Sequence, residues 1–274
     1  MGNFDGYLIC ADCDGTMVDS KGKLSERNAA AIRHFQEEGG LFTLATGRFP
    51  KHVREFEDSF MPNTYQIMGN GTTLYDVFRD EVIWEMTLTP PREVLRFVEE
   101  NDLCRLIYVD HLRHSQCWCR EDAGEYNLFR AEGTQKMEDL FMPDPEAWHK
   151  INFCFHDPEM TVKAQRLLQE QFGTEYTFVR SWSTGVELLP LGGGKGQAAL
   201  RLKSMLGDKV KKLVCIGDYE NDVSMLEVAD IGYAVANATE LCLQVADRIT
   251  VHHNEDAMAV MIAELEQEAK QEKR

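Results

Sequence analysis

Residues 7–16 of this chain read YLICADCDGT, an apolar run that leads directly into two acidic residues and a glycine. An uninterrupted apolar run of this length is typical of a strand buried on both faces, as in a parallel sheet covered by helices. Asp12 and Asp14 would repel each other there unless a cation lay close by. Mg²⁺ prefers oxygen ligands, and aspartate can form covalent phosphoryl intermediates. Because Asp-Gly is also common in plain turns, this segment alone leaves a turn and a catalytic loop equally open.

Two further apolar runs have the same form, at residues 41–45 and 213–217, and each is followed by a polar residue. Helical patterns with one apolar side cover residues 26–38 and 195–206. Strands that alternate with helices predict a doubly wound α/β fold with a parallel sheet. Such sheets bind ligands outside the carboxyl ends of their strands, where the polar residues after the three runs fall.

The stretch 81–184 differs in character, with short strand-like and helical pieces and proline-containing connections. It separates the second apolar run from the third, so we predict an inserted α/β domain. The predicted core then comprises residues 1–80 and 185–274. The tail at 264–274 is almost wholly charged and polar, and we expect it to fray.

Composition excludes several classes of protein. The formal net charge of −17 would repel a nucleic acid backbone, so no nucleic acid partner is expected. No stretch approaches the roughly 20 apolar residues of a membrane span, and residues 1–6 lack the features of a secretory signal. We therefore expect a cytoplasmic protein with no membrane partner. Its eight cysteines are expected to be free thiols, because several lie inside apolar runs.

Three other segments could complete a site beside Asp12. The sequence GDYEND at 217–222 adds three carboxylates at the end of a predicted strand. The sequence TGR at 46–48 supplies a hydroxyl and main-chain N–H groups at the predicted start of a helix, which suits a phosphate. Lys195 offers a positive charge in a glycine-rich loop, but that loop is not a nucleotide-binding P-loop, because Gly196 stands where Ser or Thr is required.

One cluster of zinc-type ligands stands apart from these segments. It contains His111, His114, Cys117 and Cys119. Its spacing matches neither a zinc finger nor a zinc ribbon. Alternation along a strand would instead place Cys117 and Cys119 on one face and Trp118 on the other. A metal site remains the minor alternative.

Taken together, the motifs resemble the haloacid dehalogenase-like hydrolase superfamily, and in particular its Cof-type phosphatases. The matching segments, in order, are DCDGT at 12–16, ATGR at 45–48, KG at 195–196 and GDYEND at 217–222. Smaller similarities lie at GNG 69–71 and at ANA 236–238, whereas Ala257 departs from the family's usual Glu-Asp-Gly. The resemblance implies a Rossmann-like core with an inserted C2-type cap domain, and Ala257 is expected to alter a turn without loss of activity.

The resemblance also implies roles for particular residues. Asp12 would be the nucleophile, and Asp14 the general acid and base. Mg²⁺ would bind Asp12, Asp218 and the main-chain carbonyl of Asp14, with Asp222 in support. The residues that would hold the phosphoryl group are Thr46, Gly47, Lys195 and Asn221. Further substrate contacts are expected from Arg48, Asn70, Arg180 and Trp182, although ordinary packing in a hinge strand is equally open for the last two.

The predicted function is hydrolysis of small phosphate monoesters, with sugar phosphates favoured over phosphorylated cofactors by the resemblance. A phosphomutase of the phosphomannomutase type is the alternative, because it would use the same nucleophile and a related cap. A non-catalytic binding protein of the same fold is a further alternative. The joint presence of Asp12, Asp14, Lys195 and Asp218 argues against it.

Overall fold

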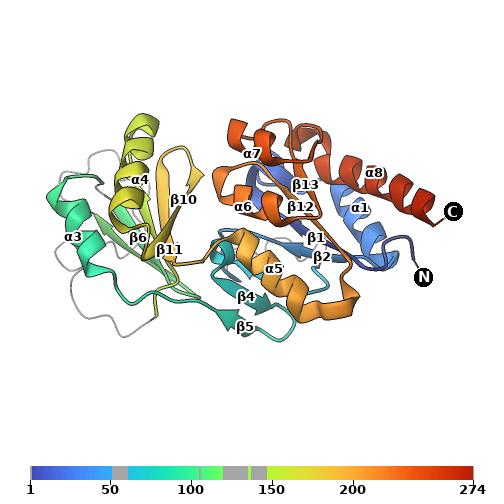
Figure 1. Cartoon of the computed structure of the whole chain (residues 1–274), viewed down its shortest axis with the longest axis horizontal. Helices are drawn as coiled ribbons and strands as arrows, with labels where there is room; N and C mark the ends of the chain where they lie inside the picture. Colours follow the sequence, from blue (N-terminus) through green and yellow to red (C-terminus); the bar gives the residue numbers. More distant parts are fainter. Residues whose placement is uncertain (1, 51–60, 105, 120–134, 137–146, 274) are drawn as a thin grey trace. The chain divides into compact units, whose positions relative to one another are not determined.

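The structure is a computed structural model, and it divides the chain into two compact units. The first comprises Met1–Glu85 and Gly194–Arg274, and the second comprises Met86–Gly193 (Figure 1). The residues that the structure describes are 2–50, 61–104, 106–119, 135–136 and 147–273.

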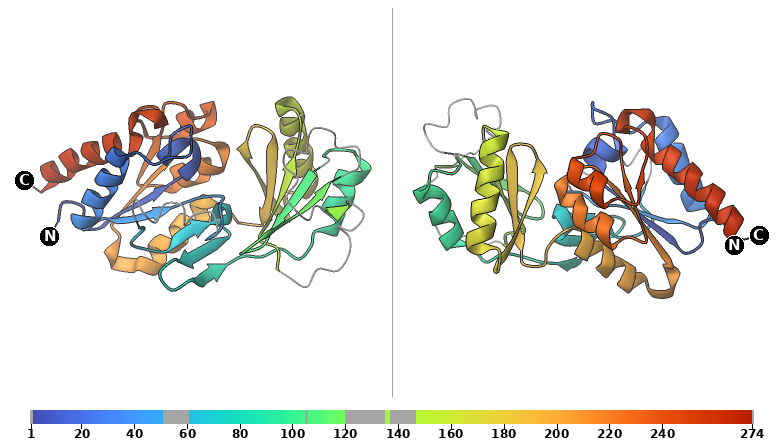
Figure 2. Two further views of the ribbon diagram at one scale, coloured as in Figure 1. Left: turned by 180° about the vertical axis from the view of Figure 1, so that it is seen from behind. Right: turned by 45° about the horizontal axis from the view of Figure 1, so that its top comes forward.

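A five-stranded parallel sheet forms the centre of the first unit. Its strands, in spatial order, are β14 (Arg248–Ile249), β13 (Ile231–Ala234), β12 (Lys212–Gly217), β1 (Tyr7–Ala11) and β2 (Leu41–Leu44). Every residue of β1 is buried, because helices cover both faces of the sheet (Figure 2). The strands predicted from the three apolar runs are confirmed.

The helices around this sheet fall into two groups. They are α1 (Glu26–Glu37), α5 (Lys195–Leu206), α6 (Glu220–Val228), α7 (Glu240–Val245) and α8 (Ala257–Glu272). α1 packs against α8, whereas α6 packs against α5 and α7. On the α5 face, Ala198 and Leu202 join a core cluster with Leu8 and Cys10 of β1. Among the described residues, no helix combines the length and apolar character that a membrane span needs.

The expected fraying of residues 264–274 is wrong. α8 continues to Glu272, because its apolar side buries Leu265 and Ala269 against the unit. Charged residues on its other sides make ion pairs with the rest of the unit, such as Arg248 with Glu268 at 2.7 Å. The prediction of fraying failed because it considered the composition of the whole segment, whereas its few apolar residues share one face of the helix.

A small antiparallel sheet lies beyond β2 in the first unit. Its strands are β3 (Gln66–Met68), β4 (Thr73–Asp76) and β5 (Glu81–Glu85). The short 3₁₀ turn η3 (Gly69–Gly71) joins β3 to β4. A parallel bridge between Ala45 and Ile67 connects β3 to the end of β2. β5 thus belongs to the first unit, although the predicted insertion began at residue 81.

In its described residues, the second unit has a six-stranded sheet and two helices. In spatial order its strands are β10 (Tyr176–Trp182), β11 (Gly185–Pro190), β9 (Lys150–Cys154), β6 (Leu106–Asp110), β7 (Ser115–Cys119) and β8 (Gln135–Lys136), and its helices are α3 (Arg92–Glu100) and α4 (Pro158–Phe172). β11 pairs with β9 and β10, so the second unit extends past the predicted limit at residue 184. The predicted α/β fold with an inserted α/β unit is confirmed.

The strand ends set the position of the candidate site. The N–H of Asp12 donates to the carbonyl of Ile216 over 2.9 Å. The N–H of Ala45 donates to the carbonyl of Ala11 over 2.8 Å. β1, β2 and β12 therefore end at the same edge of the sheet. The residues that follow them share this edge, as parallel topology requires.

Candidate active site

Asp12 follows the last residue of β1, and the next residues form the single turn η1 (Cys13–Met17). In this turn Gly15 has a φ of 80°, and a Cβ there would lie 2.5 Å from Oδ2 of Asp218. Glycine alone satisfies both conditions. The hydroxyl of Thr16 donates to Oδ1 of Asp218 over 2.8 Å. The loop after β1 is thereby linked to the loop after β12.

Lys195, the first residue of α5, is fully buried between two carboxylates. Its Nζ donates to Oδ1 of Asp12 over 2.5 Å and to Oδ1 of Asp222 over 2.6 Å. The other oxygen of Asp222 accepts the N–H groups of Asp218 and Tyr219, over 3.0 and 3.1 Å. Both oxygens of Asp222 are therefore engaged, and this residue orients Lys195 and the loop after β12.

Three carboxylates gather around this lysine. One oxygen each of Asp12, Asp218 and Asp222 lies within 4.8 Å of the others, and in the described part of the chain no other group of His, Cys, Asp or Glu is arranged to bind a metal ion. Burial raises the pKa of Asp12 well above its ordinary value, although Lys195 opposes this shift. Burial and then the charge of Asp222 raise the pKa of Asp218 to about 6.

The charges of this cluster do not balance. Burial alone would lower the pKa of Lys195, but Asp12 and Asp222 outweigh it and raise that pKa, so the lysine is an ammonium. Full ionisation of all three carboxylates beside one ammonium would leave an excess of two negative charges in a buried place, and the raised pKa values of Asp12 and Asp218 show that burial opposes it. A divalent cation that binds oxygen would remove this excess, and the donor set therefore fits such an ion.

The TGR loop follows β2 and lies against η3. The N–H of Thr46 donates to the carbonyl of Ile67, and the N–H of Asn70 donates to the carbonyl of Thr46, both over 2.9 Å. Thr46 is 1% exposed, and its hydroxyl accepts the N–H of Arg48 over 3.1 Å. The loop is thus fixed in place, whereas the helix predicted after it falls largely in residues 51–60, outside the described residues.

Arg48 and Asp14 form a two-pronged ion pair beside the buried cluster. Nε of Arg48 donates to one oxygen of Asp14 over 2.9 Å, and Nη2 donates to the other over 2.6 Å. The side chain of Asp14 is 58% exposed. Its carboxylate does not belong to the group formed by Asp12, Asp218 and Asp222, which leaves only its main-chain carbonyl for the predicted metal contact.

Two residues that were predicted to contact the substrate lie outside the first unit. Arg180 and Trp182 lie on β10 in the second unit, so their contact with a substrate stays a prediction.

Asn237 links two loops, since its Nδ2 donates to the carbonyl of Gly15 over 2.8 Å and its Oδ1 accepts the N–H of His253 over 2.9 Å. The motif at 236–238 pointed to this residue without indicating its contact.

The two histidines of the His and Cys cluster lie in a turn, and its two cysteines lie in strand β7. The rings of His111 and His114 stack, with centroids 4.5 Å apart. Cys117 and Cys119 lie in one buried cluster of β7, and Trp118 lies in another. The predicted alternation is therefore confirmed. This cluster is absent from the potential metal-binding groups of the described residues.

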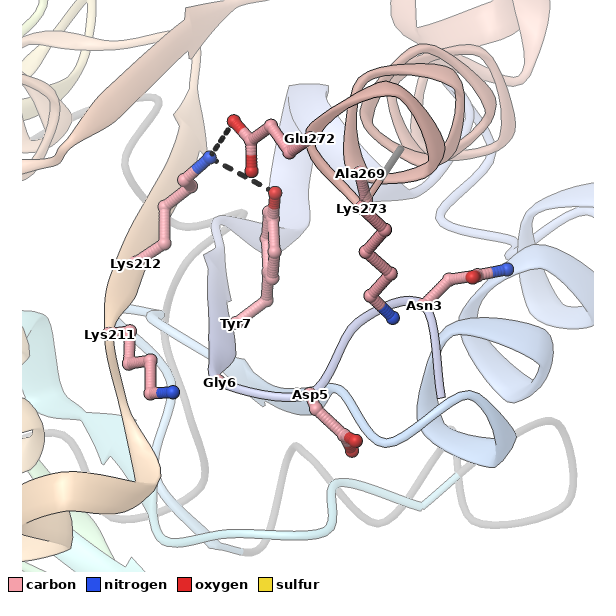
Figure 3. Close-up of a pocket in the computed structure, with 9 residues that line it drawn as sticks. All are labelled: Asn3, Asp5, Gly6, Tyr7, Lys211, Lys212, Ala269, Glu272 and Lys273. Atoms are coloured by element: carbon pink, nitrogen blue, oxygen red, sulfur yellow. Dashed lines mark hydrogen bonds and ion pairs between the residues drawn. The ribbon is translucent and has the colours of Figure 1, made fainter. Parts of the chain in front are cut away.

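A cavity of about 180 Å³ lies at the opposite ends of β1 and β12 from the carboxylate cluster (Figure 3). Nζ of Lys212 donates to the carboxylate of Glu272 over 2.9 Å and to the hydroxyl of Tyr7 over 3.0 Å. Three lysines and two acidic side chains line this cavity, and the site of the expected chemistry lies elsewhere.

Comparison with known proteins gives the class of this chain. A family model of haloacid dehalogenase-like hydrolases matches residues 9–262. The 5-amino-6-(5-phospho-D-ribitylamino)uracil phosphatase of Bacillus subtilis (strain 168) is 26% identical, over 94% of this chain and 95% of the relative. The pyridoxal phosphate phosphatase of Escherichia coli (strain K12) is 25% identical, over 93% and 97%.

A solved structure supports the same fold. A haloacid dehalogenase-like hydrolase from B. subtilis superposes with a TM-score of 0.78 at 24% identity, over 93% of this chain and 98% of that one. The chain therefore belongs to the haloacid dehalogenase-like hydrolase family. Within that family the two relatives named above are phosphatases, and the predicted enzyme class, a Cof-type phosphatase, is confirmed.

Replacement of Lys195 by Met should lower the free energy of unfolding by about 3–5 kcal/mol without added metal, because Asp12 and Asp222 would lose the ammonium buried between them. Urea unfolding in EDTA would measure the change. Lys203→Met is the matched control on the same helix, since its pair with Asp230 is partly exposed and should contribute less than about 1 kcal/mol. Equal losses in the two variants would contradict the analysis.

Proposed function

We propose that this enzyme hydrolyses small phosphate monoesters with the help of Mg²⁺, through a phosphorylated aspartate at Asp12. The observation that carries the proposal is the buried group of three carboxylates around Lys195 at the carboxyl edge of the sheet. Such a group holds a nucleophile, one fixed ammonium and room for a divalent ion. These are the parts that phosphoryl transfer needs.

In the first half of the proposed reaction, a carboxylate oxygen of Asp12 bonds to phosphorus as the bond from phosphorus to the ester oxygen breaks. Asp14 gives its proton to that leaving oxygen. In the second half, Asp14 takes a proton from water while the water oxygen bonds to phosphorus and the bond to Asp12 breaks. The pair with Arg48 engages both oxygens of Asp14 and favours the ionised carboxylate, so one of these bonds has to break before Asp14 carries the proton.

The phosphoryl group would be held by Thr46, Gly47, Lys195 and Asn221. Lys195 supplies the charge, because its ammonium already contacts Asp12. Hydrogen bonds and charge placed in advance around the phosphoryl oxygens stabilise the transition state without reorganisation during the reaction.

Mg²⁺ would be bound by Asp12, Asp218 and the main-chain carbonyl of Asp14, with Asp222 oriented behind them. The ion would neutralise the two excess charges of the cluster and draw negative charge from the phosphoryl oxygens. The raised pKa of Asp218 supports this placement, because a buried carboxylate that resists ionisation gains most from an adjacent cation.

The proposed substrates are sugar phosphates or phosphorylated cofactors. The two relatives described above are named for a phosphoribitylamino-uracil and for pyridoxal phosphate. Both names describe small phosphorylated metabolites. An enzyme of net charge −17 would bind such anions through its fixed lysine and metal ion.

Substrate preference is proposed to reside in the second unit, as a cap domain. Arg180→Ala and Trp182→Ala should raise KM for the preferred ester by roughly tenfold, the effect of one lost polar or stacking contact, with a smaller change in kcat. Steady-state kinetics would measure both constants. Arg166→Ala, an exposed arginine of α4, is the control and should leave KM unchanged. An unaltered KM in both β10 variants would exclude these two residues as substrate contacts.

The covalent mechanism predicts that Asp12→Asn lowers turnover by roughly three orders of magnitude or more, because the nucleophile is lost while the shape is kept. Release of inorganic phosphate from a panel of small esters, with Mg²⁺ or with EDTA, would measure it. Asp208→Asn, on the exposed turn Gly207–Lys209, should remain active.

Substantial activity of Asp12→Asn would rule out the covalent mechanism. If the wild-type enzyme moved the phosphoryl group to a second sugar hydroxyl without net phosphate release, it would be a phosphomutase instead.

Mg²⁺ should stabilise the protein more at pH 7.5 than at pH 5. The folded pKa of Asp218 is about 6, above its ordinary value of 3.8. The metal-free folded state therefore retains a proton that the unfolded state loses, and its stability falls as pH rises through this window. Bound Mg²⁺ would oppose that fall, by about 2.7 kcal/mol at a concentration 100 times its Kd.

Thermal unfolding with MgCl₂ and with EDTA at the two pH values would test this dependence. Asp218→Asn is the informative variant, because it should lose most of the stabilisation by Mg²⁺ and most of the dependence on pH. Equal stabilisation at both pH values, or full stabilisation in Asp218→Asn, would contradict the proposed metal site.

A further inference from the structure

Asn70 occupies an unusual place in the first unit. Its backbone is left-handed, with φ 55° and ψ 38°, a conformation that glycine adopts freely and asparagine more readily than most other residues. Its side chain is nonetheless 1% exposed and makes specific contacts. A buried amide with specific contacts, at a turn whose backbone glycine could also adopt, points to a role for the side chain.

The turn that contains Asn70 contacts the TGR loop through its main chain. The N–H of Gly69 donates to the carbonyl of Arg48 over 3.1 Å, and the N–H of Asn70 donates to the carbonyl of Thr46 over 2.9 Å. The amide of Asn70 also lies against Gly47, where a Cβ would be 3.1 Å from Nδ2 of Asn70. Two of the proposed phosphate-binding residues are therefore positioned by η3.

The same turn contacts the start of α5. At Gly71, which has a φ of 90°, a Cβ would lie 2.2 Å from the carbonyl oxygen of Gly194. Gly194 directly precedes Lys195. The close packing of the two main chains sets the position from which Lys195 reaches Asp12.

The side chain of Asn70 completes a third contact, with the first turn of α6. Its Oδ1 accepts Nδ2 of Asn221 over 3.0 Å. Oδ1 of Asn221 is buried and has no hydrogen-bond partner among the described residues. Because an amide is planar, a bond through one hydrogen of Nδ2 fixes the direction of the second hydrogen.

We infer that Asn70 is a positioning residue, which orients the amide of Asn221 so that its second N–H donates to a phosphoryl oxygen. This inference rests on the proposed function. In this inference Asn70 acts through Asn221 and Gly47, which its side chain contacts. It links the segments after β2 and β12 into one phosphate-binding surface.

The experiment compares Asn70→Gly, Asn221→Ala and the double variant. Glycine keeps the left-handed backbone and removes only the amide, so Asn70→Gly should remain folded. We expect kcat/KM to fall by roughly 10- to 100-fold in each single variant, the effect of one lost hydrogen bond to a charged group. The inhibition constant of vanadate, which resembles the phosphoryl group in transfer, should rise to a similar extent.

The double variant distinguishes positioning from a general structural role. If Asn70 acts through Asn221, Asn70→Gly should cause little further loss in the Asn221→Ala background. Asp102→Gly is the matched control, because Asp102 is also left-handed (φ 49°) but lies in the second unit. It should change neither constant.

An active wild-type enzyme with unchanged constants in Asn70→Gly would overturn this inference alone. Losses that multiply in the double variant would also overturn it. Absence of phosphate release from the wild-type enzyme would instead overturn the proposed function.

Discussion

The buried ion pairs of Lys195 with Asp12 and Asp222 are the interaction on which the rest of the site depends. Two of the three partners are completely buried, where an unpaired charge costs several kcal/mol. The lysine therefore has to be held at the start of α5, and both aspartates have to reach it from the ends of β1 and β12. The carboxylates in excess of this single lysine suit a divalent ion, and that ion together with Lys195 would offset the negative charge of a phosphate ester.

The fold supplies this arrangement through parallel topology. Strands that run in one direction place their carboxyl ends at one edge, so residues far apart in the chain become neighbours there. Glycines allow the close approach that follows. At Gly15 the chain passes so near Asp218 that no Cβ fits, and at Gly71 it packs on the main chain before Lys195. Small residues at these points position the carboxylates as much as the carboxylates' own bonds do.

Much of this could be predicted from sequence because burial leaves a periodic signature. The runs that became β1, β2 and β12 were recognisable as strands covered on both faces, and Asp12, Thr46 and Asp218 followed from their ends. The C-terminal helix was wrongly predicted to fray, because its burial leaves no such clear signature in the sequence. Leu265 and Ala269 lie among many charged residues, and their importance depends on a face that only packing reveals. The bond between Arg48 and Asp14 likewise had no signal in the spacing of either motif.

The sequence by itself determined the fold class, the order of the motifs and the chemical types of the site residues, because these follow from local patterns of polarity. Tertiary structure alone decided which charges meet. Lys195 and Asp12 are 183 positions apart, and Asn70 and Asn221 are 151 apart. No local pattern records such distances, since hydrogen bonds and ion pairs depend on ångström-scale geometry that arises only when the strands pair and the helices pack.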